Sequence, residues 1–192
     1  MKEEKLPRIH YRQLVGDIFQ GRIINMRKIL FLDIDGVLNT ERQQWHCQME
    51  GIAPIDRFGY SFDPKAVSNL ATILSATKAE IVLSSSWKFY GLDILRQMWT
   101  NRGLPGEITD ITPSNISDDL LLNADLENMD LLPGKGTEIK EWLVKHQNQV
   151  SHYAIIDDID DMLPEQQAHF VQTNPQFGIT RKDVAKVIQI FT

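Results

Sequence analysis

The chain has 192 residues, of which 42% are hydrophobic and 24% are charged, a composition typical of a globular protein with one domain. Its net charge of −6 and its pI near 5.3 exclude a strongly basic protein that binds nucleic acid nonspecifically, although they allow a local basic groove. The single cysteine, Cys47, excludes an internal disulfide and fits a reducing compartment.

Residues 1–27 precede the first predicted core strand and are expected to form an N-terminal extension. Residues 11–19 have helical periodicity. The first residues, Met1–Lys5, lack the basic-then-apolar order of a secretory signal, and no run in the sequence approaches the length of a membrane span. We therefore expect a cytoplasmic protein, or one exported by a nonclassical route.

The most informative segment follows directly. An apolar run predicts a strand near residues 28–33 that is buried on both faces, and it ends in Asp33 and Asp35, with Gly36 after them. Burying two acids is costly unless a positive group compensates them. A hard cation such as Mg²⁺ accepts carboxylate and carbonyl oxygens, and Gly36 permits a tight turn around it. The alternative is a strand that leads into an ordinary acidic turn.

A second apolar run predicts a strand near residues 79–84. Three consecutive serines, Ser84, Ser85 and Ser86, stand at its end, so the register of a functional hydroxyl is ambiguous. We favour Ser84 because it is the first serine after the apolar run. Trp87, which follows the serines, is expected to pack in the core or under a lid rather than contact a substrate.

Lys135 lies at the start of a helix that is expected near residues 136–148. The apolar positions Ile139, Trp142 and Leu143 have helical spacing, which puts Lys135 in the preceding loop or the first turn. A cation is poorly placed there with respect to the helix dipole, which indicates a functional role. The alternative is a solvated loop lysine, and Trp142 is expected to be a core residue.

A third apolar run predicts a strand near residues 152–157, and Asp157, Asp158 and Asp161 stand at its end. The carboxyl ends of parallel strands meet at one edge of an open sheet, where ligands bind. We therefore expect these acids to lie close to Asp33. The alternative is an acidic turn that caps the next segment.

The alternation of strands and helices predicts an α/β fold with a doubly wound parallel sheet, in a single domain over residues 28–192. A flap near residues 38–63 and an insertion near 113–133 interrupt the pattern. No repeat and no linker divides the sequence. The other expected elements are helices near residues 64–76, 91–102 and 180–190 and strands near residues 107–111 and 168–172.

These segments, in this order, resemble the four motifs of the haloacid dehalogenase (HAD) superfamily. Asp-Ile-Asp-Gly-Val-Leu is similar to the first motif, a strand-end serine to the second, Lys135 to the third, and two successive aspartates to the fourth. Leu-Ser-Ser-Ser-Trp at 83–87 and Gly-x-Glu-Ile-x-x-Trp-Leu at 136–143 also resemble a HAD branch associated with RNA-repair proteins. The fourth motif departs from its commonest pattern, which has another Asp where this chain has Met162.

The resemblance implies a Rossmann-like fold and an Mg²⁺-dependent phosphatase. Asp33 would attack phosphorus and form an aspartyl phosphate, while Asp35 would serve as general acid and then as general base. The Asp33 carboxylate, the Asp35 backbone carbonyl and the Asp158 carboxylate would hold Mg²⁺.

The remaining residues of the motifs would support this chemistry. Ser84 and Ser85 would bind phosphoryl oxygens, and Lys135 would neutralise the charge that gathers around the nucleophile and the phosphate. Asp157 would orient Lys135 or a metal-bound water, and Asp161 would be a supporting acid behind the metal ligands.

The short flap and insertion imply an open site, because HAD enzymes that act on small metabolites usually carry a larger cap. We therefore expect a phosphorylated macromolecule as the substrate. A phosphoprotein, including a phosphotyrosine protein, is favoured slightly over a nucleic-acid end because the chain is acidic.

Several alternatives can be weighed from the sequence. A noncatalytic HAD-like module that binds a phosphorylated partner stays open, although retention of both Asp33 and Asp35 favours an enzyme. A cysteine-dependent phosphatase is excluded because Ala53, rather than an arginine, lies six residues after Cys47. The sequence has no P-loop spacing around Lys135 and no zinc-binding histidine motif. It does not indicate the oligomeric state.

Overall fold

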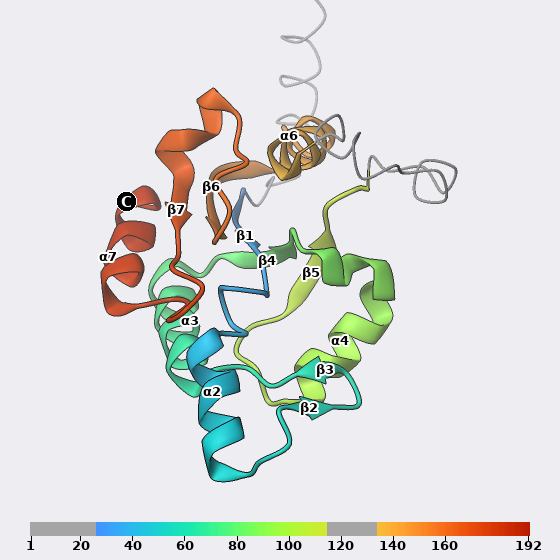
Figure 1. The fold of residues 1–192 in the computed structure, drawn as a ribbon. Helices are drawn as coiled ribbons and strands as arrows, with labels where there is room; N and C mark the ends of the chain where they lie inside the picture. The colour runs from blue at the N-terminus through green and yellow to red at the C-terminus, as the bar shows by residue number, and fades with distance from the viewer. Residues whose placement is uncertain (1–25, 115–133) are drawn as a thin grey trace, which may run out of the picture.

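The computed structural model describes residues 26–114 and 134–192. Positions 1–25 of the predicted N-terminal extension and positions 115–133 of the predicted insertion lie outside the described residues. Both assignments therefore stay predictions. The described chain is built around a parallel sheet with the strand order β5-β4-β1-β6-β7 (Figure 1). Its strands are β1 (Arg27–Leu32), β4 (Glu80–Leu83), β5 (Ile108–Ile111), β6 (Val150–Asp157) and β7 (Phe170–Gln172).

The central strand β1 is buried on both faces, as its apolar run predicts. Leu30 and Leu32 point to one side and belong to the larger hydrophobic cluster, while Ile29 and Phe31 point to the other side and belong to a smaller one. All four side chains are fully buried. A strand can lose all contact with water in this way only if other elements cover both faces of the sheet.

Helices cover both faces, so the predicted doubly wound α/β architecture is confirmed. The larger cluster contains residues of α3 (Pro64–Thr77), α4 (Leu92–Asn101) and α7 (Arg181–Ile190), and α3 and α7 lie side by side (Figure 1). The smaller cluster contains Ile139 and Trp142 of α6 (Lys135–Lys145). None of the described helices is both long and apolar enough to cross a membrane.

The segment expected as a flap contains secondary structure that the sequence analysis did not predict. It forms the helix α2 (Glu41–Glu50) and a hairpin of β2 (Ile55–Asp56) and β3 (Gly59–Tyr60). The helix begins where the Thr40 hydroxyl accepts a hydrogen bond from the Gln43 backbone at 3.1 Å. It ends at Gly51, whose φ of 65° suits a residue without a Cβ.

Two arginines fix this flap to the rest of the fold. Arg42 of α2 contacts Asp63 at 2.6 Å, and Asp63 is the N-cap of α3. Arg102, after α4, contacts Asp56 of the hairpin at 2.7 Å and stacks 4.4 Å from the centre of the Phe62 ring. The flap is therefore anchored to both α3 and α4.

Two short 3₁₀ helices complete the described fold. The first, η1 (Ser86–Tyr90), follows β4 directly and begins inside the run of serines. The second, η3 (Pro164–His169), leads into the edge strand β7. The first matters for function because it begins at the edge of the sheet where the site lies.

Candidate active site

The carboxyl ends of β1, β4 and β6 meet at one edge of the sheet, and their polar residues lie at the same level. The strand pairing continues one residue beyond β1 and β4, since the Asp33 amide donates to the Ile156 carbonyl at 3.0 Å and the Ser84 amide donates to the Leu32 carbonyl at 2.9 Å. Asp33, Ser84 and Asp157 therefore converge, as the positions of their strands predict.

A tight turn follows Asp33 and brings the acids together. The Ile34 carbonyl accepts hydrogen bonds from the backbone of Leu38 at 2.8 Å and Asn39 at 3.0 Å. Gly36 has a φ of +69°, and a Cβ at this position would lie 2.3 Å from Asp158 Oδ2. Glycine is required here because any side chain would push Asp158 away from the turn.

Three carboxylates and one lysine form the centre of the site. Ligand oxygens of Asp33, Asp157 and Asp158 all lie within 4.8 Å of one another. Lys135 Nζ lies 2.8 Å from Asp157 Oδ2 and 3.3 Å from Asp33 Oδ2. A single ammonium against three ionised carboxylates leaves two negative charges, and these carboxyls are buried or half-buried.

The pKa values of these groups reflect their burial and the excess of carboxylates over the single ammonium. Burial raises the pKa of Asp33, although the charge of Lys135 opposes the shift. Burial, followed by the charge of Asp33, raises the pKa of Asp157 to about 7, even though Lys135 also acts on this carboxyl. Burial alone would lower the pKa of Lys135, but the charges of Asp33 and Asp157 raise it above its ordinary value.

The donor set suits a hard divalent cation. Carboxylate oxygens are the ligands that Mg²⁺ prefers, and a cation of charge two would balance the excess negative charge of the cluster. The approach of Asp158 to Gly36 puts this carboxylate beside the turn that carries the Asp35 carbonyl. The structure thus brings together Asp33 and Asp158, the two side chains predicted to bind Mg²⁺, and Asp157 contacts Lys135. The roles predicted for these residues stay predictions.

Asp35 is held by two side chains that the sequence analysis did not assign to the site. Trp87 Nε1 donates to Asp35 Oδ2 at 2.9 Å, and Asn39 Nδ2 donates to Asp35 Oδ1 at 2.7 Å. Gln44 in turn donates to Asn39 Oδ1 at 3.0 Å. Trp87 also packs against Phe62, with ring centres 5.8 Å apart, so the expected packing role is accompanied by a polar one.

The three serines differ in their surroundings. Ser84 is buried, and in the described part of the chain its hydroxyl has no hydrogen-bond partner. The Ser85 hydroxyl bonds to Asp33 and accepts from the Trp87 amide at 3.4 Å. Ser86 is exposed. Within the described residues the Ser84 hydroxyl is therefore left without a partner, while the Ser85 hydroxyl contacts the predicted nucleophile.

Asp161 fixes the start of α6 rather than contacting the carboxylate cluster. Its Oδ2 accepts from the Lys135 amide at 3.0 Å, and its backbone carbonyl accepts from the Gly136 amide at 3.1 Å. A Cβ on Gly134 would lie 2.2 Å from Asp161 Oδ1. This carboxylate sits at the positive end of the α6 dipole and holds the helix turn that carries Lys135.

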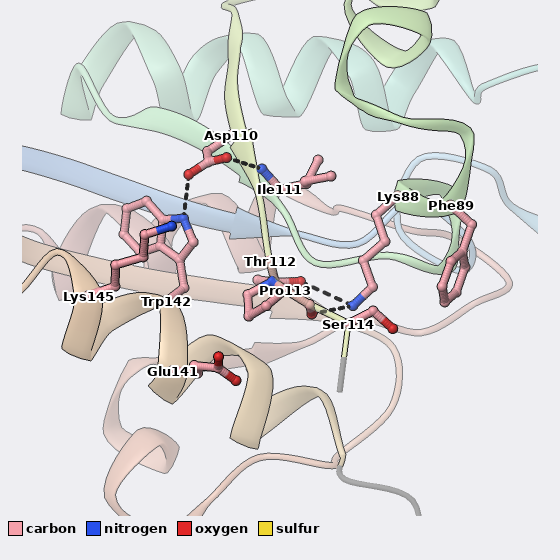
Figure 2. A pocket seen from close by; sticks show the side chains of 10 residues that line it. All are labelled: Lys88, Phe89, Asp110, Ile111, Thr112, Pro113, Ser114, Glu141, Trp142 and Lys145. Carbon is pink, nitrogen blue, oxygen red and sulfur yellow. Dashed lines mark hydrogen bonds between the residues drawn. The ribbon is translucent and has the colours of Figure 1, made fainter. Parts of the chain in front are cut away.

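A buried ion pair connects the serine loop to the lysine helix. Lys88 of η1 contacts Glu138 of α6 at 2.5 Å, and both side chains are buried. Figure 2 shows that Lys88 also reaches the carbonyl of Pro113, at 2.9 Å, and the hydroxyl of Thr112, at 3.4 Å. This pair was not predicted, because charged residues are normally assigned to the surface when only the sequence is read.

A parallel α/β sheet with this constellation of acids, serine and lysine at its carboxyl edge defines a phosphatase-type hydrolase site. The family model described as the HAD domain in Swiss Army Knife RNA repair proteins matches residues 29–184. The chain belongs to this family, which confirms the predicted HAD membership and the link to RNA-repair proteins. No curated protein and no solved structure matches the chain.

Proposed function

We propose that this protein is an Mg²⁺-dependent phosphomonoester hydrolase that removes a terminal phosphate from a nucleic-acid end. The observation that carries the proposal is the cluster of Asp33, Asp157 and Asp158 around Lys135, with Asp35 held beside it. The description of the family as a domain of RNA repair proteins favours a nucleic-acid substrate.

The first step would transfer the phosphoryl group to the protein. An Asp33 oxygen forms a bond to phosphorus while the ester P–O bond breaks, and the leaving oxygen takes a proton from Asp35. Ser85 and Lys135 keep the Asp33 carboxylate oriented, since both contact it. The hydrogen bonds from Trp87 and Asn39 hold the Asp35 carboxyl in a fixed direction.

The second step would return the protein to its starting state. Asp35, now without its proton, takes a proton from water as the water oxygen bonds to phosphorus. The bond between Asp33 and phosphorus breaks, and inorganic phosphate leaves. Two easier displacements thus replace one difficult hydrolysis.

Asp33, Asp158 and the Asp35 carbonyl would hold Mg²⁺. When bound, the ion would supply positive charge for the phosphoryl oxygens and offset the charge of the carboxylates. Lys135 shares the second of these tasks because it contacts Asp33 and Asp157. Ser84 offers an unpartnered hydroxyl, within the described residues, for one phosphoryl oxygen.

A phosphoprotein is the second candidate substrate, and the acidic net charge of −6 favours it. One experiment separates the candidates. Phosphate release in the presence of Mg²⁺ should be measured over matched oligoribonucleotides with 5′- or 3′-phosphates, a phosphotyrosine peptide and a sugar phosphate. We expect the highest kcat/KM for one of the RNA ends.

The same assay with excess chelator tests the metal. A peptide preferred over both RNA ends by about tenfold, or about 1.4 kcal/mol in transition-state binding, would reject the nucleic-acid proposal. Release from none of these substrates by the wild-type protein, with Asp33→Asn as the blank, would instead support the noncatalytic binding module.

A further inference from the structure

A hollow of about 500 Å³ opens directly beside Asp35. Asp35, Gly36 and Asn39 of the candidate active site line it, together with Tyr60 of the hairpin and Tyr90 of η1. A phosphate bound at Asp33 would bring its attached group close to the hollow, because Asp35, which lines the hollow, lies two residues after Asp33 in the same turn. Its volume falls in the range of sites that hold a small organic molecule.

Two exposed aromatic side chains line this hollow. Tyr60 is 40% exposed and Tyr90 is 60% exposed, so both leave much of their aromatic surface in water. The ring of Trp87 lies 6.0 Å from that of Tyr90, in an edge-to-face arrangement, and supports it from within. Exposed aromatic faces of this kind bind planar rings by stacking.

The charge of the hollow indicates which part of a substrate it accepts. Among its described lining residues there is no lysine or arginine, whereas Asp35 and Glu41 are acidic. A second phosphate would be repelled, so the hollow suits an uncharged ring. Gln44 and Glu41 add hydrogen-bonding groups that match the polar edge of a nucleobase. The phenyl ring of a phosphotyrosine has no such polar edge.

The walls of the hollow are fixed before a ligand binds. Gly59 of the hairpin packs so closely on Trp87 that a Cβ there would lie 2.9 Å from the indole ring. Arg102 holds the same hairpin through Asp56, at 2.7 Å, and through the Gly59 carbonyl, at 3.1 Å. Binding a ring between these walls requires little ordering of the protein, which favours affinity.

We propose that the hollow binds the nucleobase of the terminal, phosphorylated nucleotide, with Tyr90 and Tyr60 as the stacking residues. The inference rests on the proposed function and extends it to the choice of substrate. A base can enter the hollow only when it is not paired and stacked in a duplex. The enzyme would therefore select single-stranded ends over blunt duplex ends.

The test compares two oligoribonucleotides that differ only in whether the terminal phosphorylated nucleotide carries its base or is abasic. For the wild-type protein we expect kcat/KM to be about tenfold higher with the base present. Tyr90→Ala should bring this ratio close to one, whereas Tyr90→Phe should keep it, because stacking needs only the ring. Phe89→Ala is the matched control, since Phe89 is also exposed in η1 but does not line the hollow.

Three outcomes would overturn the inference. Equal kcat/KM on intact and abasic ends would reject the base site and leave the proposed phosphatase standing. Failure to release phosphate from either end would reject the proposed function itself. A phosphotyrosine peptide that exceeds both by about tenfold, and loses that advantage in Tyr90→Ala, would assign the hollow to a peptide. Thermal unfolding of Tyr90→Ala, with Tyr60→Ala as a second variant, distinguishes lost stacking from lost folding.

Discussion

At the scale of single residues, the different surroundings of Asp33 and Asp35 fit the different tasks that we propose for these two acids. Asp33 is buried beside Lys135 and Ser85, a setting that suits a group which must stay oriented toward an electrophile. Asp35 borders the hollow, and each of its oxygens accepts one hydrogen bond, so both keep a further lone pair for proton exchange. A carboxyl that lines the hollow can meet both a leaving oxygen and an incoming water.

The assignment of Asp33 as nucleophile makes a direct prediction. Asp33→Asn should lower kcat by about a thousandfold or more, because an amide has nearly the same shape but does not attack phosphorus. Phosphate release should be followed over many turnovers, with thermal unfolding as the control for folding. Turnover within about tenfold of the wild type would refute the assignment.

The metal assignment predicts a different phenotype. Asp158→Ala should raise the Mg²⁺ concentration needed for half-maximal activity by about tenfold or more, and Gly36→Ala should act in the same direction. The reason for the second effect is the overlap between a Cβ on Gly36 and Asp158 Oδ2, at 2.3 Å. A titration of activity against Mg²⁺ measures both effects.

Asp160 provides the control for that titration. It is exposed and bonds to Gln167 rather than to the cluster, so Asp160→Ala should leave the Mg²⁺ requirement unchanged. An unchanged requirement in Asp158→Ala would instead mean that Asp158 is not a ligand.

The sequence could predict the acids and Lys135 because each directly follows, or begins, an element with a recognisable apolar pattern. The partners of Asp35 could be predicted only in part. Asn39 lies four residues away and could have been noticed, but Trp87 lies 52 residues away, and only the folded sheet brings it to Asp35. Ser85 was named as a phosphate ligand, and its contact with Asp33 depends on a side-chain direction that the sequence does not specify.

At the scale of elements, the strands and the large helices were predictable and the flap was not. The predicted strands at 28–33 and 152–157 differ by only a few residues from β1 and β6, because apolar runs of a buried parallel sheet have sharp polar ends. By contrast, α2 buries only Cys47, so it shows no amphipathic pattern, and each hairpin strand has just two residues. Contacts from distant residues, such as Arg102, stabilise this segment instead.

The buried ion pair between Lys88 of η1 and Glu138 of α6 should be important for the stability of the fold. Glu138→Gln would leave Lys88 buried without a charged partner and should lower the free energy of unfolding by about 3 kcal/mol. Replacing both residues, as Lys88→Met with Glu138→Leu, removes both charges and should recover much of this loss. Chemical denaturation of the two variants measures the difference.

The control for that pair is the exposed ion pair between Lys140 and Glu165. Glu165→Gln should leave the free energy of unfolding almost unchanged, because both partners are exposed and water screens their attraction. A double variant at 88 and 138 that is no more stable than Glu138→Gln would show that the cost comes from lost packing rather than from the unpaired lysine.

The contact between α2 and α3 predicts a pH dependence of stability. Burial alone would raise the pKa of Asp63, but hydrogen bonds from Arg42, the Lys65 amide and Thr40 lower it below the ordinary 3.8. A carboxyl whose pKa is lower in the folded state stabilises the protein above the unfolded pKa and loses this effect as the pH falls through the folded value.

Asp63→Asn tests this effect because asparagine is also a good N-cap. At pH 7 the variant should be less stable than the wild type by about 2 kcal/mol, since its bonds to Arg42 are no longer made to a charged group. The difference should shrink as the pH falls below about 4. Urea denaturation across this pH range measures it, and a difference that is constant with pH would contradict the explanation.

At the scale of the whole molecule, the proposed function requires an acidic chain to bind an anionic substrate. The net charge is −6, so local groups rather than the overall field of the protein would have to hold a phosphate. Lys135 already contacts both Asp33 and Asp157, so a bound cation and the Ser84 hydroxyl would have to supply further contacts to the phosphate. In the proposed base site, the hollow beside Asp35 would bind the rest of the substrate by stacking rather than by charge.

This balance predicts an unusual response to salt. Proteins that bind nucleic acid through about six to ten phosphate contacts lose about 10³-fold or more in affinity between about 50 and 200 mM salt. Here kcat/KM for a phosphorylated RNA end should change by less than about threefold over that range, because stacking is insensitive to salt and screening relieves the repulsion by the acidic surface. For the same reason, RNA ends should improve relative to a neutral phosphopeptide as salt rises. A fall of about a hundredfold would show instead that basic side chains bind the strand beyond its terminal nucleotide.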